Sequence, residues 1–417
     1  MKNYDVIIIG AGASGLMAGC SLVKNSRKQL NIAIVDANKK AGRKLLATGN
    51  GRCNLTNDNI LPEHFHGDVN QIAELLATYS PDYIKSYFYE LGLLTFSDSE
   101  GRVYPYSRQA QSVLTVLMNT LITHNVEFIY EFAVNDICYK NKSYTISSEA
   151  GVQLSSAFCV LAAGGLASPK LSSGKNGNSI LEKLSHTFTK LSPALLPFIC
   201  KDKFIKNLQG VRSLAKVDLF SGSKLIATEP GEIQFASNSL SGVCMFNLSS
   251  HYAELKSKEN CYVMIDFIPE IEFSELINIL SDFISNNPSE DSEFLLDGLL
   301  NNKLGREILR ECKIPLNIKY REIGKKQIFS IAKLIKSCRL NVSGVKTFDD
   351  AQVTHGGVPL KEINLKTMES KKAAKLYMCG EILNINGVCG GYNLHFAWST
   401  GMRCGESIAE YYNGKSK

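Results

Sequence analysis

The sequence predicts an α/β fold in which one domain is built from both ends of the chain and is interrupted by a β-rich segment. Three observations lead to this prediction. Apolar strand-like runs alternate with periodic helical segments up to about residue 191, and short strand-and-turn patterns replace them from residue 192. Strands that end in glycine-rich turns then return towards the C-terminus. A chain of 417 residues exceeds one simple core, so two or three domains are expected.

The first element is a strand-like run over residues 4–9, which leads into a glycine-rich turn and an apolar helical segment. Gly10 permits the tight turn, Gly12 lets the backbone approach a pyrophosphate, and Gly15 lets the helix pack closely on the strand. The helix N-terminus would present free N–H groups to the phosphates. The pattern therefore predicts a dinucleotide-binding βαβ unit.

The second strand of this unit is the apolar run over residues 31–35, and an acidic residue, Asp36, follows it directly. A carboxylate at this position can accept a ribose hydroxyl, which completes the fingerprint. The alternative interpretation is a glycine-rich turn in an ordinary α/β protein.

A segment dense in glycine, basic and amide residues follows over residues 42–57. Such a loop can lay backbone N–H groups and cations against a pyrophosphate and continue towards a flavin ring. The alternative is a long surface loop without a ligand. We favour the cofactor, because the conformation of a loop with this many glycines is usually fitted to a ligand.

The pattern over the rest of the chain up to about residue 162 predicts helices and strands. Helices are expected at residues 69–79, 81–91 and 109–125, a hairpin at 92–106, and strands at 127–130, 134–139, 143–147 and 158–162. The last of these strands ends in Ala163 and Gly164, small residues that let the chain pass close to a nucleotide. A further glycine-containing stretch, residues 174–177, comes next.

The middle of the chain has a different character. Strands are expected at residues 215–220, 224–227, 232–235, 262–267 and 340–345. Residues 272–312 are helical and charged, and residues 327–338 form another amphipathic helix. These patterns predict an inserted β-rich domain with a small helical insertion.

Near the C-terminus, a strand ends in Gly380-Glu381, and the double glycine Gly390-Gly391 then opens a helix. The acid could meet ribityl or linker oxygens, and the helix N-terminus could support charge at the pyrimidine edge of a flavin. His355 is interpreted as a turn residue, since the neighbouring sequence offers it no carboxylate partner. A closing helix is expected over residues 397–412.

The composition excludes several classes of protein. The twelve cysteines include no C-x-x-C pair and no zinc-ligand spacing, so we expect reduced thiols, no metal site and no flavin–disulfide reductase. The charge of +6 is spread along the chain without an aromatic-interleaved stripe, so no nucleic-acid partner is expected. Without a membrane-length apolar run or a secretory signal, we expect a cytoplasmic protein without a membrane partner.

Taken in order, these blocks resemble the BaiN-like or YhiN-like family of bacterial NAD(P)/FAD-dependent oxidoreductases, one branch of which is called the aminoacetone oxidase family. The resemblance runs from Asp5 to about Gly405, and its most specific blocks are residues 51–54 and 390–393. It implies a Rossmann-like FAD-binding domain of residues 1–191 and 346–417, a β-rich substrate domain of residues 192–271 and 313–345, and a small helical domain of residues 272–312.

The resemblance and the motifs together predict FAD as the cofactor and leave the catalytic residues unknown. The predicted cofactor-binding residues are Gly10, Gly12, Ala13, Ser14, Gly15, Asp36, Ala37, Arg43, Lys44, Gly49, Gly51, Arg52, Cys53, Asn54, Val134, Ala163, Gly164, Gly380, Glu381, Gly390, Gly391, Tyr392 and Asn393. The chain departs from the family pattern at Ala236 and Ser239, where threonine and glycine are usual, and at Asn384, where aspartate is usual.

The predicted function is an FAD-dependent oxidoreductase that acts on a small organic substrate, with the flavin reduced by NAD(P)H or by the substrate itself. No second complete glycine fingerprint follows, so NAD(P)H would dock transiently. One alternative is an FAD-dependent amine oxidase that produces hydrogen peroxide, and another is a non-catalytic FAD-bound regulatory protein. An RNA-modifying flavoenzyme is less favoured, because no basic RNA-binding appendage is visible. The choice between NADH and NADPH and the oligomeric state stay open.

Overall fold

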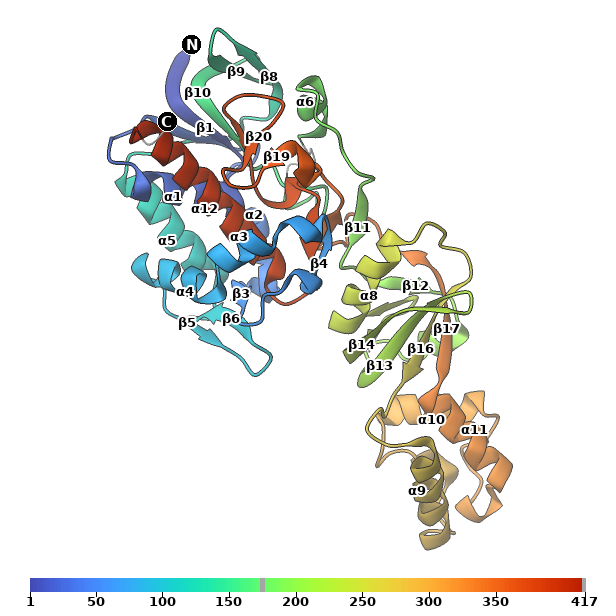
Figure 1. Ribbon diagram of the computed structural model, residues 1–417. Coiled ribbons are helices and arrows are strands. Elements are labelled where there is room, and N and C mark those ends of the chain that lie inside the picture. The colour runs from blue at the N-terminus through green and yellow to red at the C-terminus, as the bar shows by residue number, and fades with distance from the viewer. Residues whose placement is uncertain (173–176, 415–417) are drawn as a thin grey trace. The chain divides into compact units, whose positions relative to one another are not determined.

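The computed structural model describes residues 1–172 and 177–414, and the chain forms two compact units (Figure 1). Unit 1 comprises Met1–Pro193 and Ala351–Lys417, and unit 2 is the continuous stretch Ala194–Asp350. Residues 174–176 of the predicted glycine-containing stretch lie outside the described residues. The assignment of residues 272–312 to a separate helical domain stays a prediction.

Unit 1 is built on a nine-stranded sheet in which seven strands follow the order β19-β20-β21-β10-β1-β2-β7, while β9 pairs with β10 and β8 pairs with β9. Five adjacent strands of this order are parallel, and they are β21 (Leu376–Met378), β10 (Gln153–Leu161), β1 (Lys2–Ile9), β2 (Ile32–Val35) and β7 (Glu127–Ile129). All four residues of β2 and the last four of β1 are buried, as expected for a sheet covered on both faces. The carboxyl ends of these strands therefore meet at one edge.

The helices α1 (Ala13–Asn25), α5 (Ala110–Thr123) and α12 (Tyr392–Tyr412) pack together on this sheet (Figure 1). The contact between α1 and α12 depends on two glycines. A β-carbon on Gly401 would lie 2.5 Å from the carbonyl oxygen of Ser14, and one on Gly405 would lie 2.5 Å from that of Ala18. The two helix backbones therefore approach each other more closely than any side chain would allow.

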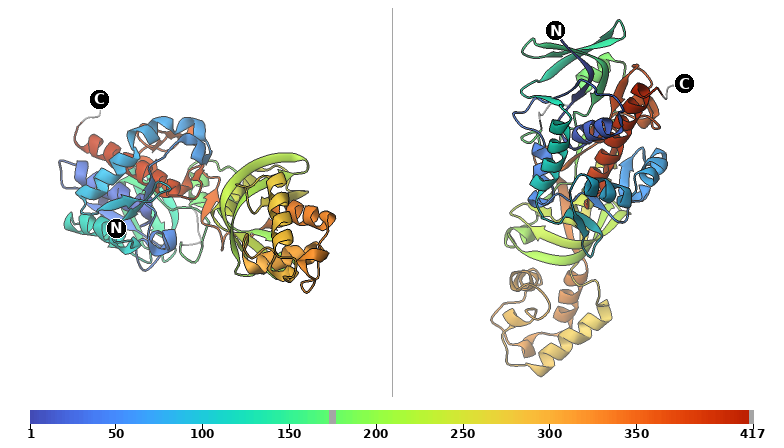
Figure 2. Two further views of the ribbon diagram at one scale, coloured as in Figure 1. Left: turned by 90° about the horizontal axis from the view of Figure 1, so that it is seen from below. Right: turned by 90° about the vertical axis from the view of Figure 1, so that its left-hand side faces the viewer.

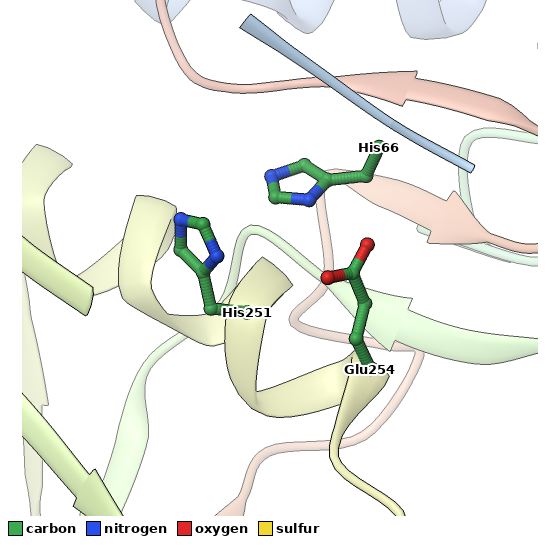
Figure 3. Close-up of side chains that lie close together, drawn as sticks. All are labelled: His66, His251 and Glu254. Carbon is green, nitrogen blue, oxygen red and sulfur yellow. The ribbon is translucent and has the colours of Figure 1, made fainter. Parts of the chain in front are cut away.

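Smaller elements complete unit 1. They are the helices α2 (Arg43–Ala47), α3 (Ala73–Thr78), α4 (Pro81–Glu90) and α6 (Asn178–Lys183), and the strands β3 (Thr56–Asn57), β4 (Phe65–Gly67), β5 (Thr95–Ser97), β6 (Arg102–Pro105), β8 (Val134–Lys140), β9 (Ser143–Ser148), β18 (Val353–His355), β19 (Ile363–Asn364), β20 (Glu369–Ser370) and β22 (Ile385–Gly387). The strand β11 (Ser192–Ala194) ends at the first residue of unit 2. His66, labelled in Figure 3, lies on β4.

Unit 2 contains a closed barrel with the strand order β12-β15-β14-β13-β16-β17. These strands are β12 (Phe198–Cys200), β13 (Arg212–Ser221), β14 (Lys224–Phe235), β15 (Ser239–Ser241), β16 (Cys261–Asp266) and β17 (Cys338–Val345), and the helices are α7 (Lys203–Lys206), α8 (Val243–Glu254), α9 (Phe273–Asn286), α10 (Asn302–Glu311) and α11 (Lys325–Lys336). Figure 2 shows α9–α11, in yellow and orange, gathered at one end of the barrel. His251 and Glu254 both project from the C-terminal end of α8 (Figure 3).

Apolar residues of the barrel and of α9–α11 form one core cluster, which includes Val217, Val263, Leu280 and Ile308. Among the helices of the described residues, none combines the length and the apolar character needed to cross a bilayer.

Three predictions about elements were wrong in detail. Residues 224–235 form the single strand β14 rather than two strands, although Pro230 and Gly231 interrupt the pattern. The proline is tolerated because β14 pairs at Pro230 with β13 alone, so its missing N–H breaks no ladder on the other side. The loop over residues 42–57 contains the short helix α2, and the closing helix begins at Tyr392 instead of residue 397.

A buried polar network joins β20 to the segment that follows α6. The imidazole of His186 lies 2.8 Å from Glu362 Oε2 through Nδ1 and 2.8 Å from the hydroxyl of Ser370 through Nε2. Lys372 Nζ and Thr187 Oγ1 donate to Glu362 Oε1 over 2.8 and 2.5 Å. Desolvation raises the pKa of Glu362, but hydrogen bonds from Lys372, Thr187 and His186 outweigh it and lower that pKa to about 2.

This network predicts an acid-sensitive contribution to stability. Because the folded pKa of Glu362 lies below the value of about 4.3 for an unfolded glutamate, the stabilisation is complete above that pH and is lost as the pH falls towards about 2. We expect Glu362→Gln to lower the free energy of unfolding by about 1–3 kcal/mol at neutral pH. The measurement is urea denaturation from pH 7 down to pH 3, where the difference from wild type should shrink. Glu182→Gln on the exposed face of α6 is the control, and an undiminished difference at pH 3 would contradict the assignment.

Candidate cofactor site

Predicted cofactor residues from both chain ends meet at the carboxyl edge of the parallel sheet. Backbone hydrogen bonds hold the strand ends in register: Gly10 N donates to Val35 O over 2.8 Å, Ala162 N to Ile9 O over 2.8 Å, and Cys379 N to Leu161 O over 3.2 Å. Gly10, Asp36, Ala163 and Gly380 each follow one of these strands directly or within two residues. The edge therefore collects four separate sequence motifs.

The three fingerprint glycines have distinct environments. Gly10 has a φ of +110°, and a β-carbon there would lie 2.3 Å from Ala162 O. A β-carbon on Gly15 would lie 1.9 Å from Gly10 O, whereas one on Gly12 would meet no atom within 4 Å. Gly10 and Gly15 are thus required by the packing of the protein itself. Gly12 faces open space beside the N-terminus of α1, where a phosphate can approach.

The first turn of α1 offers the hydrogen-bond donors that a phosphate needs. Gly12 is the N-cap residue, and the first intrahelical bond runs from Leu16 N to Gly12 O over 3.0 Å. The N–H groups of Ala13, Ser14 and Gly15 therefore have no intrahelical acceptor. The dipole of this 13-residue helix adds a favourable potential for an anion.

Asp36 is held in a fixed orientation at the end of β2. Its Oδ2 accepts from Ala11 N over 2.7 Å, and its Oδ1 accepts from Asn38 N over 2.7 Å and from Asn38 Nδ2 over 2.9 Å. An ionised carboxylate can accept about four hydrogen bonds, so it retains capacity for a ribose hydroxyl. Ala37 lies between Asp36 and Asn38 in the chain. Val134 begins β8, two residues after Phe132, whose N–H donates to Asp36 O over 2.9 Å.

Two predicted residues from opposite ends of the chain form an ion pair. Lys44 Nζ lies 2.7 Å from Glu381 Oε2, and both side chains are partly buried. Glu381 Oε1 accepts from Thr354 N over 2.8 Å. The hydroxyl of Thr354 in turn accepts from Leu166 N and Ala167 N over 2.8 and 3.0 Å. Lys44, Glu381 and Thr354 therefore connect α2, the end of β21 and the segment after β10.

Thr354 was missed as a site residue. A β-carbon on Gly165 would lie 2.3 Å from Thr354 Oγ1. Residue 165 must therefore be glycine, because Thr354 packs against it and leaves no room for a side chain. His355, the next residue, bonds through Nδ1 with Asn386 Oδ1 over 2.9 Å.

The two predicted arginines make separate contacts. Arg43 donates to the carbonyl oxygen of Lys170 over 2.6 Å and to the side chain of Asn38, so it fastens the loop to the segment after β10. Arg52 donates through Nε to Gly49 O over 3.2 Å, and its guanidinium lies 5.3 Å from the ring centre of Tyr104. The two arginines therefore contact different parts of unit 1.

The adjacent residues Cys53 and Asn54 precede β3, and a β-carbon on Gly391, the N-cap residue of α12, would lie 2.8 Å from Asn54 Oδ1. Cys53 is fully buried, and desolvation raises the pKa of its thiol to about 12, which keeps it protonated. Asn54 Oδ1 is buried, and within the described part of the chain no donor reaches it. A buried acceptor without a donor costs free energy, so the position suits a hydroxyl or N–H group of a ligand.

The turn before α12 is shaped by Gly390 and Gly391, which have φ values of +127° and +100°. The side chain of Asn393 accepts from Gly387 N and donates to Gly387 O, each over 2.8 Å. The ring of Tyr392 lies 4.7 Å from that of His64. Tyr392 and Asn393 therefore fix the turn and so orient the N-terminus of α12.

The residues at this edge fit a dinucleotide cofactor: Gly12 leaves space for phosphate, Asp36 has capacity for a ribose hydroxyl, and Asn54 offers a buried acceptor. The Rossmann-type FAD-binding α/β fold and this site define a flavoprotein oxidoreductase. The chain belongs to the family described as the HI0933-like protein Rossmann domain, whose model matches residues 4–407. The predicted resemblance and the predicted fold class are both confirmed.

Two relatives cover nearly the whole chain. A 3-dehydro-bile acid delta(4,6)-reductase of Clostridium scindens is 33% identical over 405 residues, which are 97% of this chain and 98% of the relative. A ribosomal RNA dihydrouridine synthase of Haemophilus influenzae is 27% identical over 416 residues, which are 98% of this chain and 100% of that protein. The prediction of an oxidoreductase is confirmed.

Among solved structures, the 3-ketosteroid-delta4-(5alpha)-dehydrogenase of Rhodococcus jostii RHA1 has a similar fold. The TM-score is 0.52 at 13% identity, and the match covers 98% of this chain and 97% of the other. At this identity the likeness concerns the fold alone.

The geometry of the fingerprint separates a cofactor effect from a folding effect. We expect Gly12→Val to abolish FAD binding, because the branched side chain fills the space that a phosphate needs, while the protein without FAD folds normally. The loss of ligand stabilisation, about 4 kcal/mol at a thousandfold excess of FAD over Kd, should appear as a lower melting temperature only when FAD is present. The measurements are FAD content and melting temperature with and without added FAD.

Two comparison variants sharpen this test. Gly15→Val, by contrast, should unfold the protein as well as abolish FAD binding, since its side chain collides with Gly10 O. Gly298→Val, in unit 2 and likewise without an atom within 4 Å, should change neither FAD content nor stability. A Gly12→Val protein with full FAD content would contradict the assignment.

Proposed function

We propose that this protein is an FAD-dependent reductase that adds hydride and a proton across a carbon–carbon double bond conjugated to a carbonyl, with NAD(P)H as the reductant. The observation that carries the proposal is the 33% identity, over nearly the full length of both chains, to a protein named as a delta(4,6)-reductase of a 3-dehydro-bile acid. That name describes reduction of double bonds in a substrate that is oxidised at position 3. Such a substrate is a small organic molecule.

When bound, FAD supplies the site that accepts hydride from the reductant and gives it to the substrate. The chain's own residues bind and orient that cofactor. The first turn of α1 receives the diphosphate, Asp36 receives the adenosine ribose, and Asn54 accepts a hydrogen bond inside the protein. Lys44, fixed by Glu381, and the N-terminus of α12 place positive potential at the edge of the sheet.

A second candidate is reduction of uridine in ribosomal RNA. Its support is that two relatives carry the name ribosomal RNA dihydrouridine synthase, at 27% identity in Haemophilus influenzae and 24% in Escherichia coli. The two candidates share their chemistry, since the double bond of uracil is also conjugated to a carbonyl. They differ in the size and charge of the substrate. The absence of a nucleic-acid partner and the cytoplasmic location both stay predictions.

We expect NADH or NADPH to reduce the flavin of the purified protein under anaerobic conditions, and a conjugated enone to reoxidise it. The test follows the flavin absorbance after addition of each nicotinamide and then of 3-oxo-4-ene steroids or uridine-containing RNA. Rapid reoxidation by the steroid supports the first candidate, and formation of dihydrouridine supports the second. Reduction by amines with release of peroxide in air, and none by either nicotinamide, would instead establish the amine oxidase alternative.

We also propose that substrate specificity resides in unit 2, where Ala236 and Ser239 depart from the family pattern. Ala236 N donates to Ser239 O over 2.9 Å, so the two residues close one turn, and Ser239 is buried on β15. The double variant Ala236→Thr, Ser239→Gly should change turnover of the organic substrate while FAD content stays at the wild-type value. The reason is that the predicted cofactor residues all belong to unit 1.

The melting temperature of the double variant is the control, because Ser239→Gly can loosen the turn. A double variant that lost FAD but kept normal turnover per bound FAD would show that unit 2 supports the cofactor rather than the substrate.

A further inference from the structure

The β5–β6 hairpin of unit 1, labelled in Figure 1, carries aromatic rings on one face. Phe96 on β5 and Tyr104 on β6 are directly opposite each other in the antiparallel register, with ring centres 5.9 Å apart. Side chains at opposed positions lie on the same face of a sheet. The ring of Tyr106, just beyond β6, lies 6.2 Å from that of Phe96, and 67% of this residue is exposed. The three rings therefore form one continuous row.

Two arginines lie over this row. The guanidinium of Arg108 is 5.1 Å from the ring centre of Phe96, and that of Arg52 is 5.3 Å from the ring centre of Tyr104. Neither arginine forms an ion pair with any described residue. The carboxylates of this hairpin, Asp98 and Glu100, instead pair with Arg102. Arg52 Nε donates to Gly49 O, which leaves its terminal Nη groups for a ligand. A guanidinium over a ring can present such N–H groups to the oxygens of a phosphate.

An open hollow of about 380 Å³ adjoins the exposed end of this row. Its lining includes Leu94 and Tyr106 and the neutral polar side chains of Gln111 and Ser112 on α5. The volume lies at the lower end of the range for small-ligand sites, about 300–1,000 Å³. A hollow with apolar and neutral polar walls beside an exposed tyrosine suits a planar base better than a charged group.

We propose that the surface formed by Arg52, Phe96, Tyr104, Tyr106 and Arg108, here called the hairpin surface, binds the nicotinamide dinucleotide that reduces the flavin. The adenosine occupies the hollow beside Tyr106, and the diphosphate lies along Arg108 and Arg52. Two guanidiniums complement the two negative charges of a dinucleotide diphosphate. This inference rests on the proposed function, which requires NAD(P)H.

The direction of binding follows from the position of Arg52. This residue immediately precedes Cys53 and Asn54, so a dinucleotide that extends from the hollow past Arg108 to Arg52 brings its nicotinamide end to the loop of the candidate cofactor site. Hydride then leaves the reduced nicotinamide with both electrons, NAD(P)⁺ departs, and the bound flavin is reduced. The surface explains how the chain can use NAD(P)H without a second glycine fingerprint.

The test is equilibrium binding of NAD⁺ and NADP⁺ to the purified FAD-loaded protein by calorimetry, together with the rate of anaerobic flavin reduction by NADH and NADPH. Arg108→Ala and Tyr106→Leu should each weaken binding of the preferred dinucleotide by roughly tenfold, the loss expected for one charged or stacking contact. FAD content and melting temperature should not change, since both side chains lie on the surface. The controls are Arg27→Ala, beside Asn413 at the far end of α12, and Tyr89→Leu, exposed on α4.

The outcomes separate this inference from the proposed function. If NADPH or NADH reduces the flavin of both variants with wild-type concentration dependence, the hairpin surface is not the docking site and the proposed function stands. If neither nicotinamide reduces the wild-type flavin, the proposed function fails and this inference fails with it. If a uridine-containing single-stranded RNA binds wild type and loses affinity in both variants, while neither dinucleotide binds, the surface belongs to an RNA substrate and the inference is overturned.

Discussion

The close approach of α12 to α1 is the constraint on which the cofactor site depends. Gly401 and Gly405 let the two helix backbones meet, and this contact fixes α12 beside the fingerprint turn. A β-carbon on Gly380 would lie 2.4 Å from Ser14 Oγ, so the end of β21 is pressed against the same helix. The positions of Glu381 and of the glycine turn before α12 follow from this packing.

Helix α12 also holds the loop over residues 42–57 in place. Trp398 Nε1 donates to Leu55 O over 2.9 Å, and the hydroxyl of Thr56 lies 2.7 Å from His395 Nδ1. Desolvation lowers the pKa of His395 to about 3, so its ring is neutral and adds no charge beside the cofactor. The positive potential at this edge therefore comes from helix termini and from Lys44, whose charge Glu381 partly neutralises.

The parts of the site that could be predicted are those that local chemistry specifies. The turn from Gly10 to Gly15 and the acid at Asp36 are each read from a few consecutive residues. Thr354 could not be assigned in this way, because its partners at residues 166–167 and 381 are distant in the sequence. The network of His186 and Glu362 was missed for the same reason. The break predicted within β14 was wrong because Pro230 is harmless where a strand has one neighbour.

The division of unit 1 into two stretches has a consequence for biosynthesis. The ribosome releases residues 1–193 well before residues 351–417, and unit 2 emerges in between as one continuous stretch. Domains generally fold as units during synthesis. The barrel has all its strands while the parallel sheet still lacks β21, and α1 still lacks the helix α12 that packs against it. A nascent chain therefore acquires its ability to retain FAD only after residues 376–412 have emerged, and a chain that stopped before Leu376 would carry an assembled barrel attached to a sheet without β21.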